Sequence, residues 1–228
     1  NNYYDIISMS YLFLSCTEMA DKRLTKVATK LLEGYLIDQW SDFENFEFLN
    51  DVEFLDQLNN HISFLGKKCI QTPCGGGYFL IYLDIESDPE IKKVITKQFE
   101  ENVSKMEPLV DWLRLFRKAG GRNEPLIGGD RITSGEILVE VEKSKHVQKG
   151  LKELSAKLGK TASTVKDQIN GVIQFLVQRE YLVPVGVVGT EFLATSRWSI
   201  FYDEAEYLAE HNAIDITQTD DVEQGELL

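Results

Sequence analysis

Apolar residues recur at helical spacing near the start of the chain. Residues 3–19 and 22–36 predict two helices, because each carries apolar side chains three or four positions apart. Gly34 is placed to help end the second helix. Residues 37–49, rich in acidic and aromatic side chains, predict an irregular connector, with a short helix as the alternative. The apolar face of the second helix consists of Leu24, Val27, Leu31 and Tyr35.

The pattern changes from helical to extended between residues 50 and 83. Asn50 followed by Glu53 resembles a capping box, and Gly66 is placed to end the helix that it opens. Two β-rich runs then flank a glycine-rich break at residues 73–77, which predicts a β-hairpin. This order of elements, helices followed by a hairpin, is typical of a winged helix. The apolar stripe of the predicted helix consists of Phe54, Leu55, Leu58, Ile62 and Leu65.

A long amphipathic segment follows the hairpin. The run Ser87–Glu90 predicts a helix start, with two cap candidates, a proline in the first turn and a glutamate that completes the box. Pro108 interrupts the apolar stripe, so we expect either a kink or a new helix there. The new helix would belong to a second domain. Residues 119–131, with four glycines and one proline, predict the clearest loop in the chain.

Residues 132–210 repeat the order of helices followed by a hairpin. A helix is predicted over 132–142, opened by Thr133 and Glu136. Two further apolar faces, separated by Gly159 and a polar turn, predict a helix-turn-helix at 147–183. The wing strands are then 181–185 and 191–195, and a last helix spans 199–210. The two apolar faces consist of Leu151, Leu154, Leu158, Val165, Ile169, Val172, Ile173 and Leu176.

These elements predict an α+β, mainly helical fold with tandem winged-helix domains. The N-terminal winged-helix domain is predicted over residues 1–104 and the C-terminal one over 105–211. Residues 212–228 form an acidic tail that has almost no apolar pattern, so we expect it to be disordered.

Charge is distributed unevenly along the chain. The formal net charge is -13, yet residues 143–166 hold seven lysines against Glu153 alone. Residues 203–228 hold nine acidic residues and no Lys or Arg. DNA affinity depends on neutralised phosphates, so the whole protein should not bind DNA strongly by itself. This balance favours a subunit that works beside other proteins.

The lysine-rich segment supplies the candidate DNA-binding residues. Flexible ammonium groups suit non-specific phosphate contacts, although a solvated face is the equally weighted alternative. The predicted wing, residues 183–195, contains no Lys or Arg, which argues against sequence-specific base readout. Whether the helix-turn-helix contacts DNA directly stays open. The candidates are Lys143, Lys145, Lys149, Lys152, Lys157, Lys160 and Lys166.

Aromatic side chains are dense between residues 40 and 48. They alternate with acidic residues, which is unusual for a solvated connector, and aromatic residues are favoured in the cores of interfaces. We therefore consider them candidate partner-binding residues, with packing on their own domain as the alternative. They are Trp40, Phe43, Phe46 and Phe48.

No motif for catalysis, metal binding or a cofactor is recognisable. The glycines at 75–77 are not followed by Lys-Ser/Thr or by a helix, so they do not form a phosphate-binding loop. His61, His146 and His211 lack neighbouring catalytic partners, and three cysteines without a repeated pair predict neither a zinc site nor disulfides. No apolar run is long enough to span a bilayer. We expect a non-enzymatic cytoplasmic protein.

Several short segments resemble one family of bacterial proteins. They are the run Leu31–Ile37, the acidic aromatic connector after it, the helix beginning Asp51-Val52-Glu53-Phe54, and the hairpin Cys69–Leu80. Together with the segment Arg117–Gly121, they resemble the MukE/MksE accessory subunits of SMC complexes, including Wadjet-type relatives. The resemblance extends over residues 20–211 and includes no catalytic motif.

The resemblance implies a function as well as a fold. It implies a homodimer of tandem winged helices that binds a MukF/MksF-like kleisin, contacts the SMC ATPase indirectly, and helps to clamp double-stranded DNA non-specifically. Such a subunit would be cytoplasmic, nucleoid-associated and non-catalytic, and would act in chromosome organisation and segregation or in plasmid restriction. The resemblance implies that the lysines of residues 143–166 contact DNA, and it adds Arg179 to the candidate DNA-binding residues. The alternative is a winged-helix transcriptional regulator, and an enzyme with an unrecognised site is a third hypothesis.

Overall fold

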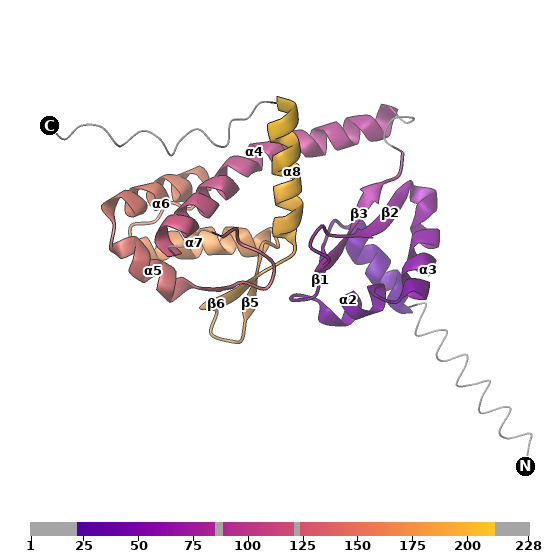
Figure 1. Ribbon diagram of the computed structural model, residues 1–228, viewed down its shortest axis with the longest axis horizontal. Helices are drawn as coiled ribbons and strands as arrows, with labels where there is room; N and C mark the ends of the chain where they lie inside the picture. Colours follow the sequence, from indigo (N-terminus) through magenta and orange to yellow (C-terminus); the bar gives the residue numbers. More distant parts are fainter. Residues whose placement is uncertain (1–21, 85–88, 121–123, 213–228) are drawn as a thin grey trace, which may run out of the picture.

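A computed structural model of the protein describes residues 22–84, 89–120 and 124–212. In these ranges the fold is α+β and mainly helical, with two antiparallel sheets of three strands each. Each sheet lies in a separate group of elements, and one long helix connects the two groups (Figure 1). The helix predicted over residues 3–19, the cap candidates Ser87 and Asp88, and the acidic tail after residue 212 lie outside the described residues.

The first group, here called the N-terminal unit, extends from residue 22 to residue 83. A helix over residues 22–32 is followed by a short strand, two helices and the predicted hairpin, in the sheet order β1-β3-β2. Gly66, with a φ of 67°, ends the helical region as predicted. The elements are β1 (Ile37–Asp38), α2 (Phe43–Leu49), α3 (Val52–Ile62), η1 (Ser63–Leu65), β2 (Lys67–Gln71) and β3 (Gly77–Tyr82).

The N-terminal unit has its own apolar core. Leu24, Val27 and Leu31 are buried there, as the helical spacing predicts. They pack with Leu58 of α3 and with residues of all three strands. Tyr35, the fourth position of the predicted stripe, is 48% exposed, because the helix ends at residue 32 and the chain then turns into β1.

Helix α4 (Pro89–Gly120) leads from the N-terminal unit into the second group. It begins with Pro89, as predicted, and runs through Pro108 without interruption, so the expectation of a new helix at Pro108 is wrong. The half after the proline packs into the second group. Leu109, Trp112 and Leu115 are buried in the core of the second group.

The second group, here called the C-terminal unit, comprises this half of α4 and the elements up to residue 212. Its sheet order, β4-β6-β5, repeats the order of the first sheet, since a short strand pairs with the second strand of a hairpin. The elements are β4 (Arg131–Thr133), α5 (Ser134–Glu142), α6 (Lys145–Lys157), α7 (Val165–Gln178), β5 (Leu182–Val185), β6 (Glu191–Ala194) and α8 (Arg197–Asn212).

Three local predictions need correction. The segment 37–49 is not irregular: the alternative prediction, a short helix, is confirmed as α2. Residues 37–38 form β1, because Ile37 pairs with Tyr78 of the hairpin. Asn50 does not cap α3: the cap is Asp51, and the Asn50 side chain accepts a hydrogen bond from the Tyr78 hydroxyl at 2.9 Å. Residues 132–133 belong to strand β4, because they pair with β6.

Candidate nucleic-acid interface

The helix pair α6–α7 is held by caps and by a hydrogen-bonded turn. Ser144 accepts a hydrogen bond from the Val147 amide, and Thr164 accepts one from the Asp167 amide at 3.1 Å. Between the helices Gly159 adopts a φ of 65°, a conformation that glycine takes without strain. The buried Ser155 hydroxyl donates to the Lys160 carbonyl and fixes the end of the turn. The predicted helix-turn-helix is therefore confirmed as two helices joined by a rigid turn.

The exposed face of α7 and the wing carry little positive charge. The hairpin β5–β6 has no Lys or Arg, and Arg131 of the neighbouring strand is paired with Glu191 at 2.9 Å. Between α7 and the hairpin lies an open cavity of about 620 Å³ lined by uncharged residues. Amide and apolar groups there offer phosphates no countercharge. The lining residues are Asn170, Ile173, Gln174, Val177, Gln178, Pro184, Gly189 and Phe192.

The structure divides the eight candidate DNA-binding residues among several surfaces. Lys145, Lys149 and Lys152 lie on the exposed face of α6, spaced four and three residues apart and therefore in one row. Of these three, Lys149 is 3.9 Å from Glu153, and Lys145 and Lys152 form no ion pair with any described residue. This row, called the lysine row below, is the largest group of candidates on one element.

The other five candidates lie around the lysine row or apart from it. Lys143, at the end of α5, pairs with Glu140 at 2.5 Å. Lys160 lies in the turn and Lys166 at the start of α7. Arg179 lies at the far end of α7, about 20 Å from Lys166 at 1.5 Å per residue, and its guanidinium covers the Phe175 ring.

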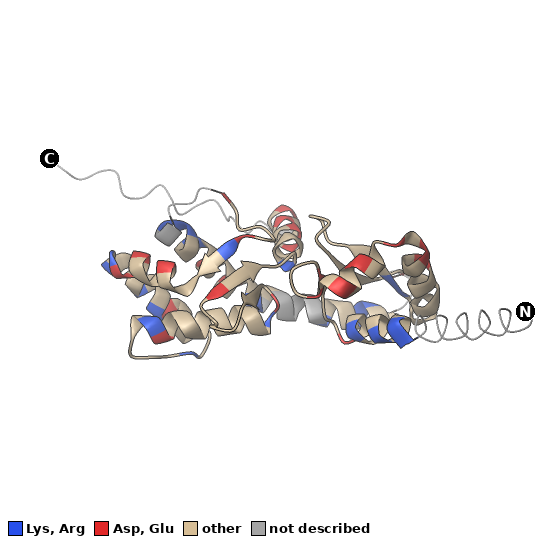
Figure 2. Ribbon diagram, turned by 90° about the horizontal axis from the view of Figure 1, so that it is seen from below, with Lys and Arg blue, Asp and Glu red and all other residues tan. Residues whose placement is uncertain are grey.

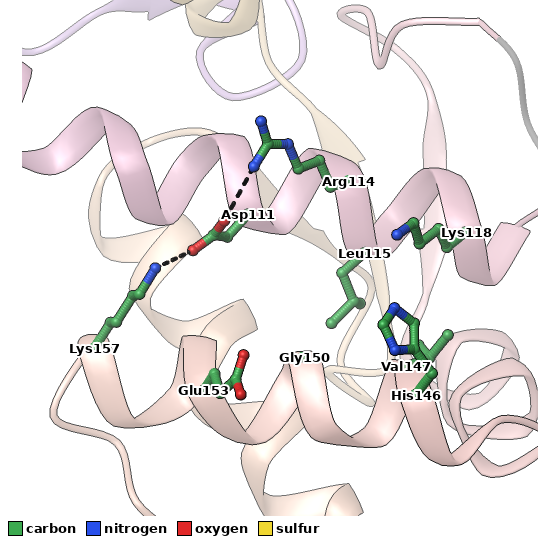
Figure 3. A pocket seen from close by; sticks show the side chains of 9 residues that line it. All are labelled: Asp111, Arg114, Leu115, Lys118, His146, Val147, Gly150, Glu153 and Lys157. Atoms are coloured by element: carbon green, nitrogen blue, oxygen red, sulfur yellow. Dashed lines mark hydrogen bonds and ion pairs between the residues drawn. The ribbon is translucent and has the colours of Figure 1, made fainter. Parts of the chain in front are cut away.

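Lys157 faces α4 on a different side of α6 (Figure 3). Its ammonium donates to Asp111 at 2.6 Å and to Glu107 at 2.7 Å, and these hydrogen bonds raise the pKa of Lys157. This lysine therefore links two helices of the C-terminal unit, and its charge is compensated within the protein.

A cavity of about 160 Å³ between α4 and α6 gathers basic side chains that the sequence does not place together. Figure 3 shows Lys118 of α4 and His146 of α6 at one end of it, and Asp111 and Lys157 at the other. The fourth basic residue, Arg114, lies 3.9 Å from Asp111. The pair Arg117-Lys118 is visible in the sequence, but its proximity to α6 depends on the packing of α4 against the helix-turn-helix.

The helix over residues 22–32 carries a second basic surface that the sequence analysis missed (Figure 2). Lys22 and Lys26 are exposed on it. Arg23 and Lys30 lie on the same helix, and they pair with Glu44 and, at 2.6 Å, with Asp42. The sequence does contain a signal for this surface, because basic residues recur at helical spacing beside the apolar face of this helix.

The four candidate partner-binding aromatic residues have different surroundings. Phe46 is buried in the core of the N-terminal unit, and Phe48 packs against Phe54 at a centroid distance of 5.8 Å. Trp40 lies against Gly128 and Gly129 of the C-terminal unit. Only Phe43, 64% exposed, presents most of its ring to solvent, so packing within the chain accounts for the other three.

The described residues contain no cluster of three or more His, Cys, Asp or Glu side chains that could hold a metal ion. Within the same residues, every helix is too short or too polar to cross a membrane.

The family model described as condensin complex protein MksE matches residues 22–205. The match extends from the first described helix into α8, and so includes both units and α4. Among curated proteins no significant match is found. The chain therefore belongs to the MksE family of condensin complex proteins, and is a subunit of an SMC-like complex.

Proposed function

We propose that the protein is a non-catalytic subunit with two winged-helix domains that binds a MukF/MksF-like kleisin and helps an SMC complex to clamp DNA. Membership of the MksE family carries this proposal. The repeated strand order of the two sheets supports the tandem winged-helix assignment. The separation of the cores, the second of which begins at Leu109, supports a domain boundary near residue 104.

The distribution of charge supports a non-specific contact with double-stranded DNA. The lysine row presents three ammonium groups on one exposed helix face, which suits phosphates spaced along a backbone. The cavity between α7 and the hairpin is lined by uncharged residues, so it offers no positive charge to hold the DNA backbone during sequence-specific recognition. In this assembly the protein is a cytoplasmic, nucleoid-associated homodimer without a cofactor, and it acts in chromosome segregation or plasmid restriction.

The capped helix-turn-helix supports a second candidate, a transcriptional regulator. Such a regulator should bind one DNA sequence about 10³-fold or more tightly than others at physiological salt.

Co-purification with the products of the neighbouring genes tests the first proposal against the second. We expect a kleisin-like protein to be recovered, and the mass of the complex to correspond to two copies of this chain per kleisin. Recovery of the chain alone, followed by binding to one DNA sequence far more tightly than to unrelated DNA, would replace the SMC proposal by the regulator.

A further inference from the structure

The N-terminal and C-terminal units meet at a junction that buries a carboxylate. Asp38 of β1 is 0% exposed, and its side chain accepts hydrogen bonds from the amide of Ser196 at 2.7 Å and from the Ser196 hydroxyl at 2.5 Å. Ser196 immediately precedes α8, so a carboxylate of one unit lies at the first turn of a helix of the other. The amide groups and the dipole of a helix N-terminus favour a negative charge at this position.

Trp40 forms the second contact of the junction. Its indole lies so close to three glycines that a Cβ atom added at Gly128 would be 2.4 Å from the ring, and one at Gly76 2.8 Å. At Gly129, with a φ of 90°, the corresponding distance is 3.0 Å. Gly128 and Gly129 belong to the C-terminal unit and Gly76 to the hairpin of the N-terminal unit. The ring therefore occupies a slot that exists only because glycines from both units lack side chains.

Glu180 forms the third contact. Its carboxylate accepts a hydrogen bond from the Leu36 amide at 3.3 Å and pairs with Arg197 at 2.8 Å. Glu180 has a φ of 60°, a backbone conformation that residues other than glycine seldom adopt. Its own carbonyl accepts a hydrogen bond from the Thr195 hydroxyl at 2.5 Å, which helps to hold the residue in this conformation.

From these three contacts we infer that the junction is a lock that fixes the angle between the two units, so that the protein acts as one rigid body. The cores of the units have no residue in common, and no core residue of either cluster belongs to the three contacts. The units could therefore reorient without unfolding if the junction were absent. Figure 1 shows β1 of the N-terminal unit facing the region where α8 begins. The lock sets the direction in which the lysine row points relative to the basic helix 22–32.

Burial raises the pKa of Asp38, and the hydrogen bonds from Ser196 partly counteract this effect. Burying a carboxylate without hydrogen bonds lowers the stability of the folded protein. The amide and hydroxyl of Ser196 must therefore stay within hydrogen-bonding distance of Asp38. Because hydrogen bonds are directional, the contact of Asp38 with Ser196 fixes the orientation of the two units. An apolar contact would allow the units to slide past each other.

Pulsed electron paramagnetic resonance on the full chain tests the lock. Spin labels at Asp56→Cys of α3 and Glu136→Cys of α5, both exposed positions, report the distance between the units. Cys16 and Cys74 are replaced by Ser, Cys69 is buried, and dilution with unlabelled protein suppresses distances between copies. We expect one narrow distance distribution in the parent protein and a distribution at least about twice as broad in Asp38→Ala and in Gly128→Ala.

Gly135→Ala is the matched control, because a Cβ at this exposed glycine of α5 meets no atom within 4 Å. It should keep the narrow distribution. Far-UV circular dichroism and urea unfolding verify that each variant remains folded, and Trp40→Ala replaces Gly128→Ala if the latter does not fold. A broad distribution in the parent protein would overturn the inference. Folded variants of Asp38 and of the Trp40 slot that keep the parent distribution would overturn it as well.

Discussion

Single side chains decide where helices of this protein begin. Asp51 accepts hydrogen bonds from the amides of Glu53 at 2.8 Å and Phe54 at 3.2 Å, and so satisfies two of the free amides in the first turn of α3. Ser144 caps α6 and Thr164 caps α7, each by accepting a hydrogen bond from one amide of the first turn. Asparagine is a favoured N-cap residue, but the Asn50 side chain accepts a hydrogen bond from the Tyr78 hydroxyl instead.

Replacing Asp51 with Ala should lower the free energy of unfolding by about 1 kcal/mol, because the amides of the first turn lose their acceptor. Asp56→Ala, on an exposed face of the same helix, serves as the control and should change it by less than about 0.5 kcal/mol. Urea unfolding followed by circular dichroism measures both. Equal effects of the two substitutions would show that Asp51 does not act as a cap.

Two partly buried tyrosines should titrate late. Burial raises the pKa of Tyr181 to about 12 and that of Tyr202 to about 12, above the ordinary value of about 10. The folded state favours the neutral phenols, so their contribution to stability is complete below pH of about 10 and is lost as the pH rises through about 12. The Tyr202 hydroxyl also donates to the Leu126 carbonyl at 2.8 Å.

Absorbance at 295 nm should therefore show a fraction of the tyrosines still neutral at pH of about 11 in the folded protein. Tyr202→Phe should reduce this late fraction. An unchanged late fraction in Tyr202→Phe would contradict the assignment.

At the scale of elements, α6 and α7 depend on each other. Leu154 and Ile169, each 1% exposed, come from the two helices and lie in the same core as Trp112 of α4 and Trp198 of α8. Most of their stability should therefore come from packing, as is usual for helices of 13 and 14 residues.

Ile169→Asp should prevent the C-terminal unit from folding. An unpaired carboxylate in this core costs several kcal/mol, which is comparable with the whole stability of a domain. Asn170→Asp, at the exposed neighbouring position, introduces the same side chain and should change the stability by less than about 0.5 kcal/mol. Thermal unfolding measures both, and a normal transition in Ile169→Asp would refute the proposed core.

At the scale of the whole molecule, an acidic protein presents local basic surfaces. The net charge of -13 opposes long-range attraction to DNA, so contact should rely on the lysine row and on partners that hold the protein in place. The compensation of Lys157 by Asp111 and Glu107 makes it a poor candidate for this contact.

The triple substitution of Lys145, Lys149 and Lys152 by Glu should abolish DNA binding by the assembled complex while leaving kleisin binding intact. With Gln at one of these positions, the slope of log affinity against log salt should fall by about 1, if that lysine contacts one phosphate. Glu at Lys92, Lys93 and Lys97 of α4 changes the net charge equally and is the control. Equal losses in the two triple variants would point to net charge, and unchanged binding would exclude the lysine row.

The sequence by itself determined the elements whose signals are local. Apolar spacing predicted a helix over residues 22–36, which the structure shows over 22–32, and the helices α3, α6 and α7. The β-rich runs around glycines predicted both hairpins. These signals are visible in the sequence because each element buries one face, so that apolar residues recur along the element with its helical or strand period.

Only the tertiary structure decided the features that depend on residues distant in sequence. Strands β1 and β4 are three residues long or shorter and exist because hairpin strands pair with them. The cavity of Arg114, Lys118 and His146 forms where α4 crosses α6. The assignment of Trp40 and Asp38 to the junction required Gly128, Gly129 and Ser196, which lie about 90–160 residues further along the chain. Strand pairing, the proximity of charged side chains and the close packing of a ring on glycines all depend on distances in space. The order of residues along the chain does not determine these distances locally.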